Sequence, residues 1–415
     1  MSALRWWPLL GLVLLLVACA TGREGPSEPS GASRTASASA SAVGPPAAGP
    51  AASPAPGSAD PWAVSAPPGR PALPAPAPPD ELTVPQLAGQ RVVYSYPGPT
   101  PPPELLEEIR QGRAAGVIFF AENIAAPEQF GQAVAQLRQA QRESPVHLPL
   151  LLMTDQEGGA VRRLPGGPAL SERQVGQAAD PVAAAALAGR EAGENLAGFG
   201  LNVNLAPVLD VYDRPGDFID RSGRSYGQHP AAVAALGQAF IRAQQATGVA
   251  ATAKHFPGLG TAPAGADTDA EPVALPIPAA ALRERDEAPY PAAIAAGVQL
   301  VMVSWAVYPA LDPDHPAGLS PTVVGGELRE RLGYGGVTIT DALEAGGLAG
   351  VGDTGQRAVA AAAAGMDLLL CSARDVEQGR QAVAALAAAL TAGQLDGAGF
   401  GAAVDRVTAL RAGLR

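Results

Sequence analysis

From residue 90 onward, the hydrophobic positions of the chain gather into short runs separated by longer segments of helical character. Eight runs are rich in β-branched and other apolar residues, at 91–95, 116–120, 148–154, 202–206, 250–254, 300–304, 337–340 and 367–371. Several of them are continuously apolar, as expected of parallel strands that are covered on both faces. The pattern therefore predicts eight buried parallel strands.

The segments between these strands carry helix start and stop signals. Segment 181–197 has Asp180 at its N-cap position, Pro181 at its first helical position and Gly198 just beyond its end. Further helices are predicted at 127–141, 230–247, 322–332 and 380–390. A strand followed by a helix, eight times in succession, predicts an α/β fold with a single (β/α)8 TIM barrel. A dinucleotide-binding open sheet is disfavoured, because no Gly-x-Gly-x-x-Gly turn follows the first strand.

The first 80 residues have a different composition. Residues 1–18 combine Arg5 with an apolar stretch too short to cross a bilayer, which predicts a signal peptide. Residues 16–19, Leu-Val-Ala-Cys, resemble a bacterial lipobox, in which Cys19 is lipidated. Residues 19–80 are mostly Pro, Ala, Ser and Gly and offer too little apolar surface to fold, which predicts a disordered tether. The barrel is expected in residues 81–415, outside the cytoplasm and held at the membrane by the lipid anchor only.

Charge and cysteine content exclude several classes of protein. The formal net charge of −11 argues against nucleic acid as a partner and against electrostatic attachment to anionic lipid. After Cys19 the only cysteine is Cys371, so no intramolecular disulfide is expected in the barrel. Cys371 lies in an apolar run and is predicted to be a buried small hydrophobe. We see no pattern of metal ligands and predict no metal site.

Polar side chains gather directly after four of the predicted strands. In a TIM barrel, the C-terminal ends of the strands carry the active site. Any one of these groups could be explained by a helix cap or a solvated loop, but four at the same end of the barrel indicate a functional site. The residues are Asp155 and Glu157 after the third strand, Asp210 after the fourth, Lys254 and His255 at the end of the fifth, and Asp341 after the seventh.

The motifs that contain these residues together resemble glycoside hydrolase family 3. They are residues 155–164, beginning Asp-Gln-Glu-Gly-Gly, then 204–210, 224–227, 254–258 and 337–341. Their order and spacing match the N-terminal barrel domain of that family over roughly residues 85–412. No second α/β domain is expected after the barrel, and in this the chain is similar to the single-domain bacterial β-N-acetylhexosaminidase lipoproteins.

The resemblance implies a role for each matching residue. Asp341 matches the nucleophile of a retaining glycosidase, which forms a covalent bond to the anomeric carbon. Asp155 matches a carboxylate that accepts hydrogen bonds from sugar hydroxyls. Asp210 matches a motif position for which a structural role and a sugar contact are equally compatible. The remaining substrate-binding residues are Arg163, Arg224, Lys254 and His255. The implied partner is a carbohydrate, an amino-sugar glycoside, and no cofactor is implied.

The general acid/base departs from the family pattern. The single-domain hexosaminidases carry Asp-Ser-His on a mobile loop after the fifth strand, where this chain has Asp267, Thr268 and Asp269. We predict Asp269 as the acid/base and Glu271 as the alternative, while turn capping in a solvated loop is the non-catalytic explanation. For Asp269 to donate a proton near neutrality, its pKa would have to rise from about 3.9, through burial and nearby negative charge.

Three residues near the sixth strand have more than one interpretation. Trp305 could stack on a sugar face or lie in the core, and both fit its position equally. Met302 and Tyr308 are predicted to be packing residues.

Three functions remain open at this point. The first is a retaining exo-glycosidase acting on terminal β-N-acetylhexosaminides of cell-wall origin. The second is a β-glucosidase-like or glycan-transferring activity on the same scaffold. The third is a glycan-binding lipoprotein that has lost turnover. The loop at 260–272 separates the first from the third, because the sugar-binding residues are present while the usual proton donor is not.

Overall fold

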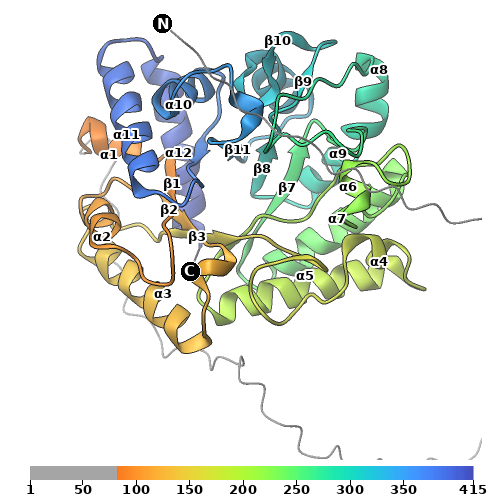
Figure 1. Ribbon diagram of the computed structural model, residues 1–415, viewed down its shortest axis with the longest axis horizontal. Coiled ribbons are helices and arrows are strands. Elements are labelled where there is room, and N and C mark those ends of the chain that lie inside the picture. The colour runs from red at the N-terminus through yellow and green to blue at the C-terminus, as the bar shows by residue number, and fades with distance from the viewer. Residues whose placement is uncertain (1–81, 415) are drawn as a thin grey trace, which may run out of the picture. The chain divides into compact units, whose positions relative to one another are not determined.

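The computed structural model describes residues 82–414, which form a closed barrel of parallel strands surrounded by helices (Figure 1). The order around the barrel is β1-β12-β11-β8-β7-β6-β3-β2. The barrel strands are β1 (Val92–Tyr94), β2 (Gly116–Ile118), β3 (Leu151–Thr154), β6 (Val203–Asn204), β7 (Ala250–Phe256), β8 (Leu300–Val303), β11 (Val337–Ala342) and β12 (Leu368–Leu370). All eight predicted strands and the TIM barrel are confirmed. The predictions for the signal peptide, Cys19 and the tether lie outside the described residues.

Helices follow most of the strands and cover the barrel. They are α1 (Val84–Gly89), α2 (Pro103–Arg110), α3 (Pro127–Arg142), α4 (Glu172–Gly176), α5 (Pro181–Gly198), α6 (Phe218–Arg221), α7 (Pro230–Gln245), α8 (Ala279–Ala281), α9 (Tyr290–Ala295), α10 (Thr354–Ala363), α11 (Val376–Thr391) and α12 (Gly397–Gly413). The predicted cap of α5 is present, since Asp180 accepts a hydrogen bond from the Ala183 N–H at 3.1 Å. Within residues 82–414, no helix has the length and apolar character needed to span a bilayer.

Several smaller elements lie in the loops between the barrel strands and the helices. Two antiparallel hairpins pair β4 (Gln156–Gly158) with β5 (Val161–Arg162), and β9 (Val307–Tyr308) with β10 (Asp312–Pro316). Short 3-10 helices are η2 (Ala121–Asn123), η4 (Ala317–Leu319) and η6 (Gly346–Leu348), and π-helices are η3 (Leu282–Asp286) and η5 (Thr322–Arg331). The helix expected at 322–332 is therefore present, but with π geometry.

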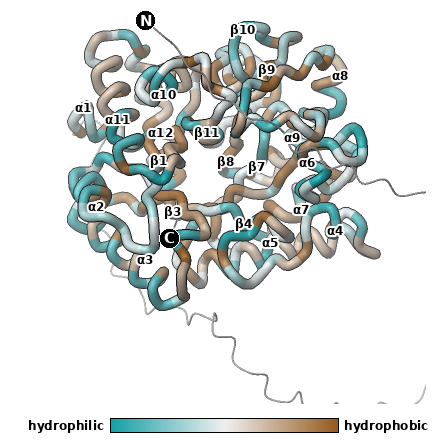
Figure 2. Tube along the Cα trace, viewed as in Figure 1, coloured by the Kyte–Doolittle hydropathy of each residue, from teal (hydrophilic) through white to brown (hydrophobic). Residues whose placement is uncertain are grey.

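Alternating strand positions build two separate hydrophobic cores. In β3, Leu151 and Met153 belong to the core inside the barrel, whereas Leu152 packs in the layer between strands and helices. This alternation follows from the period of two in a β-strand, and it explains why the strands are apolar on both faces. The surrounding helices carry both hydrophilic and hydrophobic positions (Figure 2).

The C-terminal helix closes one end of the barrel. Val407 and Leu410 of α12, with Leu414 just beyond it, belong to the core inside the barrel. Arg411 is buried and donates from Nε to the Pro149 carbonyl at 2.8 Å, close to the start of β3. The N-terminal ends of the strands are thereby covered, which leaves the C-terminal ends as the open side.

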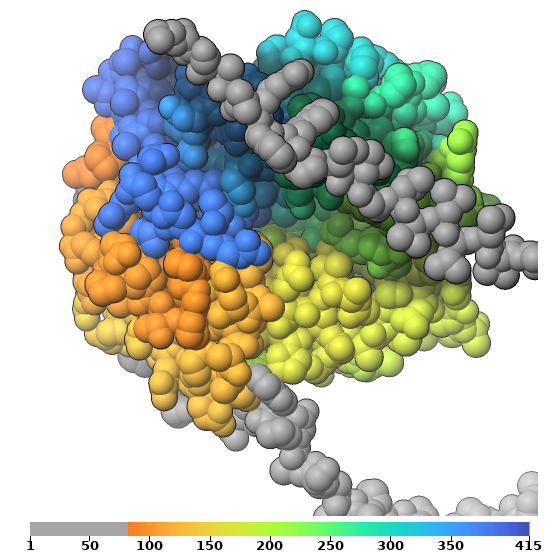
Figure 3. All heavy atoms as spheres, viewed as in Figure 1, coloured from red at the N-terminus to blue at the C-terminus, as the bar shows by residue number. Residues whose placement is uncertain are grey.

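The first and the last strand of the barrel meet along one seam. β1 pairs with β12 in parallel, with Val92 opposite Leu369 and Val93 opposite Leu370. The space-filling view shows the early segments, in orange, beside the late segments, in blue (Figure 3).

Candidate active site

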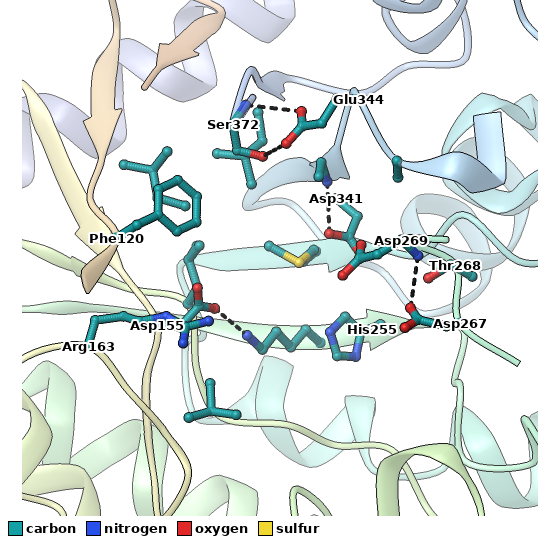
Figure 4. A pocket seen from close by; sticks show the side chains of 18 of the residues that line it. Phe120, Asp155, Arg163, His255, Asp267, Thr268, Asp269, Asp341, Glu344 and Ser372 are labelled. Carbon is teal, nitrogen blue, oxygen red and sulfur yellow. Dashed lines mark hydrogen bonds and ion pairs between the residues drawn. The ribbon is translucent and has the colours of Figure 1, made fainter. Parts of the chain in front are cut away.

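A cavity of about 510 Å³ opens at the C-terminal ends of the strands. The strands β7, β8 and β11 and the segments after β2, β3, β6, β7, β11 and β12 contribute to its lining. Of the eight residues predicted to act in catalysis or sugar binding, seven line this cavity: Asp155, Arg163, Arg224, Lys254, His255, Asp269 and Asp341. Figure 4 shows that most of these side chains converge on one space. Asp210 is the exception.

A buried network of two cations and two carboxylates forms one wall. Lys254 Nζ lies 2.8 Å from Asp155 Oδ1 and 2.6 Å from Glu157 Oε1. Arg224 binds the same Glu157 carboxylate with both Nε, at 2.9 Å, and Nη2, at 2.8 Å. A bidentate pair of this kind fixes the planes of both groups. The network therefore holds Asp155 and Lys254 in a defined geometry beside the cavity.

The charges within this network compensate one another. Burial alone would lower the pKa of Lys254, but the negative charges of Asp155 and Glu157 outweigh it and raise that pKa above its usual value. Burial would likewise raise the pKa of Glu157, but Arg224 and Lys254 hold it well below its usual range. Both groups are therefore ionised at neutral pH. The sequence alone indicates no particular role for Glu157, which lies two residues after Asp155 and shares Lys254 with it.

Asp210 lies behind His255 rather than in the cavity. Its carboxylate accepts hydrogen bonds from His255 Nδ1 at 2.7 Å and from the Leu259 N–H at 2.7 Å, and the residue is fully buried. We predicted Asp210 as a substrate-binding residue, with a structural role as the alternative. Its burial and its hydrogen bonds favour the structural role, in which Asp210 orients His255. With Nδ1 engaged by Asp210, Nε2 is the ring nitrogen of His255 available to a ligand.

Asp341 stands at the end of β11, one residue before the strand ends. Its Oδ1 accepts a hydrogen bond from the Ala342 N–H at 2.8 Å. The Trp305 indole donates from Nε1 to the Ala342 carbonyl, also at 2.8 Å, and this tryptophan is fully buried. Of the two roles that the sequence allowed for Trp305, the structure shows the core position. Its indole holds the backbone beside Asp341 through the hydrogen bond to Ala342. Tyr308 is buried as predicted, while Met302 both packs in the barrel core and touches the cavity.

Asp269 lies opposite this strand end, on the segment after β7. Figure 4 shows its carboxyl group close to that of Asp341. Burial in the cavity wall is the largest cause that raises the pKa of Asp269, to about 6, and the negative charges of Asp341 and Asp267 act in the same direction. The residue as a whole is solvent-exposed, as Glu271 is, but its carboxyl group faces the cavity (Figure 4), so a bound sugar would bury that carboxyl further. Glu271, the alternative donor, is exposed and does not line the cavity.

The far side of the cavity contains residues without a sequence motif. The Arg374 guanidinium lies 4.4 Å above the Phe120 ring and pairs with Glu122 at 3.1 Å. Glu344 accepts hydrogen bonds from the Ser372 hydroxyl at 2.7 Å and from its N–H at 3.2 Å. These residues come from loops after β2, β11 and β12, where the sequence offers no spacing rule that would have revealed them.

The cavity contains carboxylates, the Asp269 carboxyl group with its raised pKa, and hydrogen-bond donors. These are the groups that a site for glycosyl transfer requires. Among residues 82–414, no cluster of three or more His, Cys, Asp or Glu side chains is placed to hold a metal ion. Cys371 is free and buried, and burial raises the pKa of its thiol, so it is not poised as a nucleophile.

Comparison with known proteins gives the family. The model for the glycosyl hydrolase family 3 N terminal domain matches residues 81–410. The chain therefore belongs to glycosyl hydrolase family 3. A protein of Arthroderma benhamiae described as a secreted glycosyl hydrolase is 46% identical over 345 residues, which cover 83% of this chain and 97% of that protein. A beta-hexosaminidase of Stenotrophomonas maltophilia is 35% identical over 285 residues, covering 66% of this chain and 81% of that protein.

Solved structures agree with this assignment. A family 3 beta-N-acetylglucosaminidase from Paenibacillus sp. is 37% identical with a TM-score of 0.75, and the match covers 80% of this chain and 62% of that one. A beta-N-acetylhexosaminidase from Beutenbergia cavernae is 32% identical with a TM-score of 0.73, covering 80% of this chain and 99% of that one. The chain thus spans almost the whole Beutenbergia protein and under two thirds of the Paenibacillus protein.

Proposed function

We propose that the chain is a retaining exo-glycosidase that hydrolyses terminal β-N-acetylhexosaminides. Asp341 is the nucleophile and Asp269 the general acid/base. The observation that carries this proposal is that the carboxyl groups of Asp269 and Asp341 lie close together in one cavity (Figure 4), where the pKa of Asp269 is raised. A retaining glycosidase needs two carboxyl groups at its site, one that attacks the anomeric carbon and one that donates a proton to the leaving oxygen. The relatives named beta-hexosaminidase and beta-N-acetylhexosaminidase support the choice of sugar.

The reaction takes two steps. In the first, the Asp341 carboxylate attacks the anomeric carbon, the bond to the leaving oxygen breaks, and protonated Asp269 gives its proton to that oxygen. In the second, ionised Asp269 takes a proton from water, which attacks the same carbon and releases Asp341. Asp155, Arg163, Arg224, Lys254 and His255 hold the terminal sugar by hydrogen bonds to its hydroxyls during both steps.

A panel of 4-nitrophenyl β-glycosides tests the activity and the sugar together. We expect turnover of the N-acetylglucosaminide or N-acetylgalactosaminide to exceed that of the glucoside, because the relatives act on N-acetylated sugars. Proton NMR of the first product should show the β-anomer, as double displacement requires. A preference for the glucoside would favour the β-glucosidase-like alternative. Sugar binding without turnover of any substrate would favour the glycan-binding one.

The location of the enzyme follows from its N-terminal sequence. Residues 16–19 support lipidation at Cys19, and the similarity to a secreted glycosyl hydrolase supports a position outside the cytoplasm. A tether of about 60 residues would then carry the barrel away from the membrane. Substrates at such a position are cell-wall or peptidoglycan-derived sugars.

Replacing Cys19 by serine removes the lipid acceptor. We expect Cys19→Ser to move the enzyme from the membrane fraction into the medium, or to leave it as the unprocessed precursor. Fractionation followed by mass determination of the mature chain measures this, with Cys371→Ser as the control, since that thiol is buried in the barrel. A correctly processed Cys19→Ser protein that stays in the membrane fraction would exclude the anchor.

A further inference from the structure

The turn that carries Asp269 is attached to the loop that follows β11. The Gly346 N–H donates to the Asp269 carbonyl at 2.8 Å, and the Gly347 N–H donates to the Thr268 carbonyl at 2.8 Å. Within the turn, the N–H groups of Ala270 and Glu271 both donate to the Asp267 carbonyl at 3.0 Å. The peptide on each side of Asp269 is therefore held by backbone hydrogen bonds to a second loop.

The two loops approach each other so closely at Gly346 and Gly347 that there is little room for a side chain. A Cβ atom on Gly346 would lie 2.1 Å from the Ala270 carbonyl oxygen and 2.3 Å from its carbonyl carbon. A Cβ atom on Gly347 would lie 3.0 Å from the Thr268 oxygen and 3.2 Å from Trp305 Cβ. Neither glycine has a φ in the left-handed region, so the backbone conformation itself would accept another residue. A methyl group at position 346 therefore cannot coexist with the present position of the turn.

The loop that receives the turn is itself fixed. Leu348 is fully buried and Ala345 nearly so, which anchors both sides of the glycine pair in the core. Gly347 packs over Trp305, whose indole bonds the Ala342 carbonyl next to Asp341. The Asp341 strand end, the glycine pair and the Asp269 turn thus form one continuous unit.

We propose that Gly346 and Gly347 are positioning residues, which set Asp269 at its working distance from Asp341. The inference rests on the proposed function, in which Asp269 is the acid/base. Neither glycine touches the substrate, and each acts through the backbone of the Asp269 turn. The acid is therefore held opposite the nucleophile by a backbone contact between two loops.

Gly346→Ala tests the inference in the full mature chain, with Gly350→Ala as its matched control. Gly350 lies in the same loop, is exposed and has no left-handed φ, and a Cβ atom added there would meet no other atom within 4 Å. Each variant is assayed on a 2,4-dinitrophenyl glycoside, whose leaving group needs no proton, and on an alkyl glycoside or disaccharide, whose leaving group does. Circular dichroism and thermal unfolding report whether the variants fold.

We expect Gly346→Ala to lower kcat/KM for the poor leaving group by about 10²-fold, the effect of an ångström-scale displacement. Its kcat/KM on the dinitrophenyl glycoside, which reports the first step only, should stay near the wild-type value. On the poor leaving group, the decline of kcat/KM above pH 6 should disappear from the pH profile. Gly350→Ala should remain within about two-fold of wild type on both substrates. If Gly346→Ala does not fold, Gly347→Ala takes its place, because a Cβ atom at position 347 would come no closer than 3.0 Å to another atom. We expect the same change in kcat/KM from that variant.

Two results would overturn the inference. One is a folded Gly346→Ala enzyme with a wild-type ratio of rates on the two substrates, and the other is an equal loss on both. Asp269→Asn, assayed in parallel, separates this outcome from failure of the proposed function. If Asp269→Asn slows only the poor leaving group while Gly346→Ala does not, the positioning role alone is wrong. If Asp269→Asn has no effect, the acid assignment is wrong and the positioning role falls with it.

Discussion

Asp341→Asn is expected to lower kcat by about 10⁴-fold, which corresponds to about 5 kcal/mol of barrier. The substitution keeps the shape of the side chain but removes the negative charge and the nucleophilic oxygen. Sugar binding should survive, because the cavity wall formed by Lys254, Arg224 and Glu157 is held together by its own ion pairs. Steady-state kinetics on an aryl N-acetylhexosaminide and calorimetric binding of the product sugar measure the two effects separately.

An external nucleophile provides a sharper control. Removing the carboxylate altogether, in Asp341→Ala, opens the face from which azide can attack an activated substrate. Attack from that face inverts the anomeric carbon, so the product should be the α-glycosyl azide. A near-normal kcat in Asp341→Asn, or a β-azide from Asp341→Ala, would show that Asp341 is not the nucleophile.

Asp269→Asn is expected to slow substrates with poor leaving groups by about 10²- to 10⁴-fold, the usual contribution of a general acid. Substrates with dinitrophenolate leaving groups should form the glycosyl-enzyme at an almost unchanged rate, because their leaving group needs no proton. Stopped-flow measurement of the first turnover isolates this step. Glu271→Gln is the matched control, since that carboxylate is exposed and outside the cavity, and it should behave as wild type.

The same assignment fixes the sign of the pH dependence. Asp269 acts as an acid only in its protonated form, and its pKa in the free enzyme is raised to about 6. Wild-type kcat/KM on a poor leaving group should therefore fall by about ten-fold per pH unit above pH 6. Asp269→Asn should lack this decline. A wild-type profile that stays flat from pH 5 to pH 8 would contradict the raised pKa.

Most of the fold follows from periodicity, because strands buried on both faces leave a clear apolar run in the sequence. Several of the eight barrel strands show such a run, and the others lie at predicted positions in the same strand–helix alternation; β7 and β11 continue to Phe256 and Ala342, past the predicted ends. The helix α12 is not predicted from the sequence, for a physical reason. It contacts the inner core through Val407 and Leu410, and the outer core through Phe400 and Val404, so its sequence shows no single apolar stripe.

The site is predictable where residues share a strand end and a motif, as Asp155, Lys254 and Asp341 do. The burial of Asp210 is not predictable, because a carboxylate that orients a histidine and one that binds a sugar look alike in sequence. The role of Gly346 and Gly347 also depends on a contact between segments about 77 residues apart in the chain, measured from Asp269 to Gly346. Local sequence rules do not report contacts of that kind.

The seam between β1 and β12 has a consequence for how the chain reaches its native state. Val92 can pair with Leu369 only after nearly the whole barrel sequence has been made, and α12 lies still further along the chain. Contacts of such large sequence separation slow folding, because the entropy of closing the loop is lost before the contact forms. Until then, β1 offers an unpaired strand edge. The period in which the chain is most exposed to aggregation therefore lasts until β12 is available to pair with that edge.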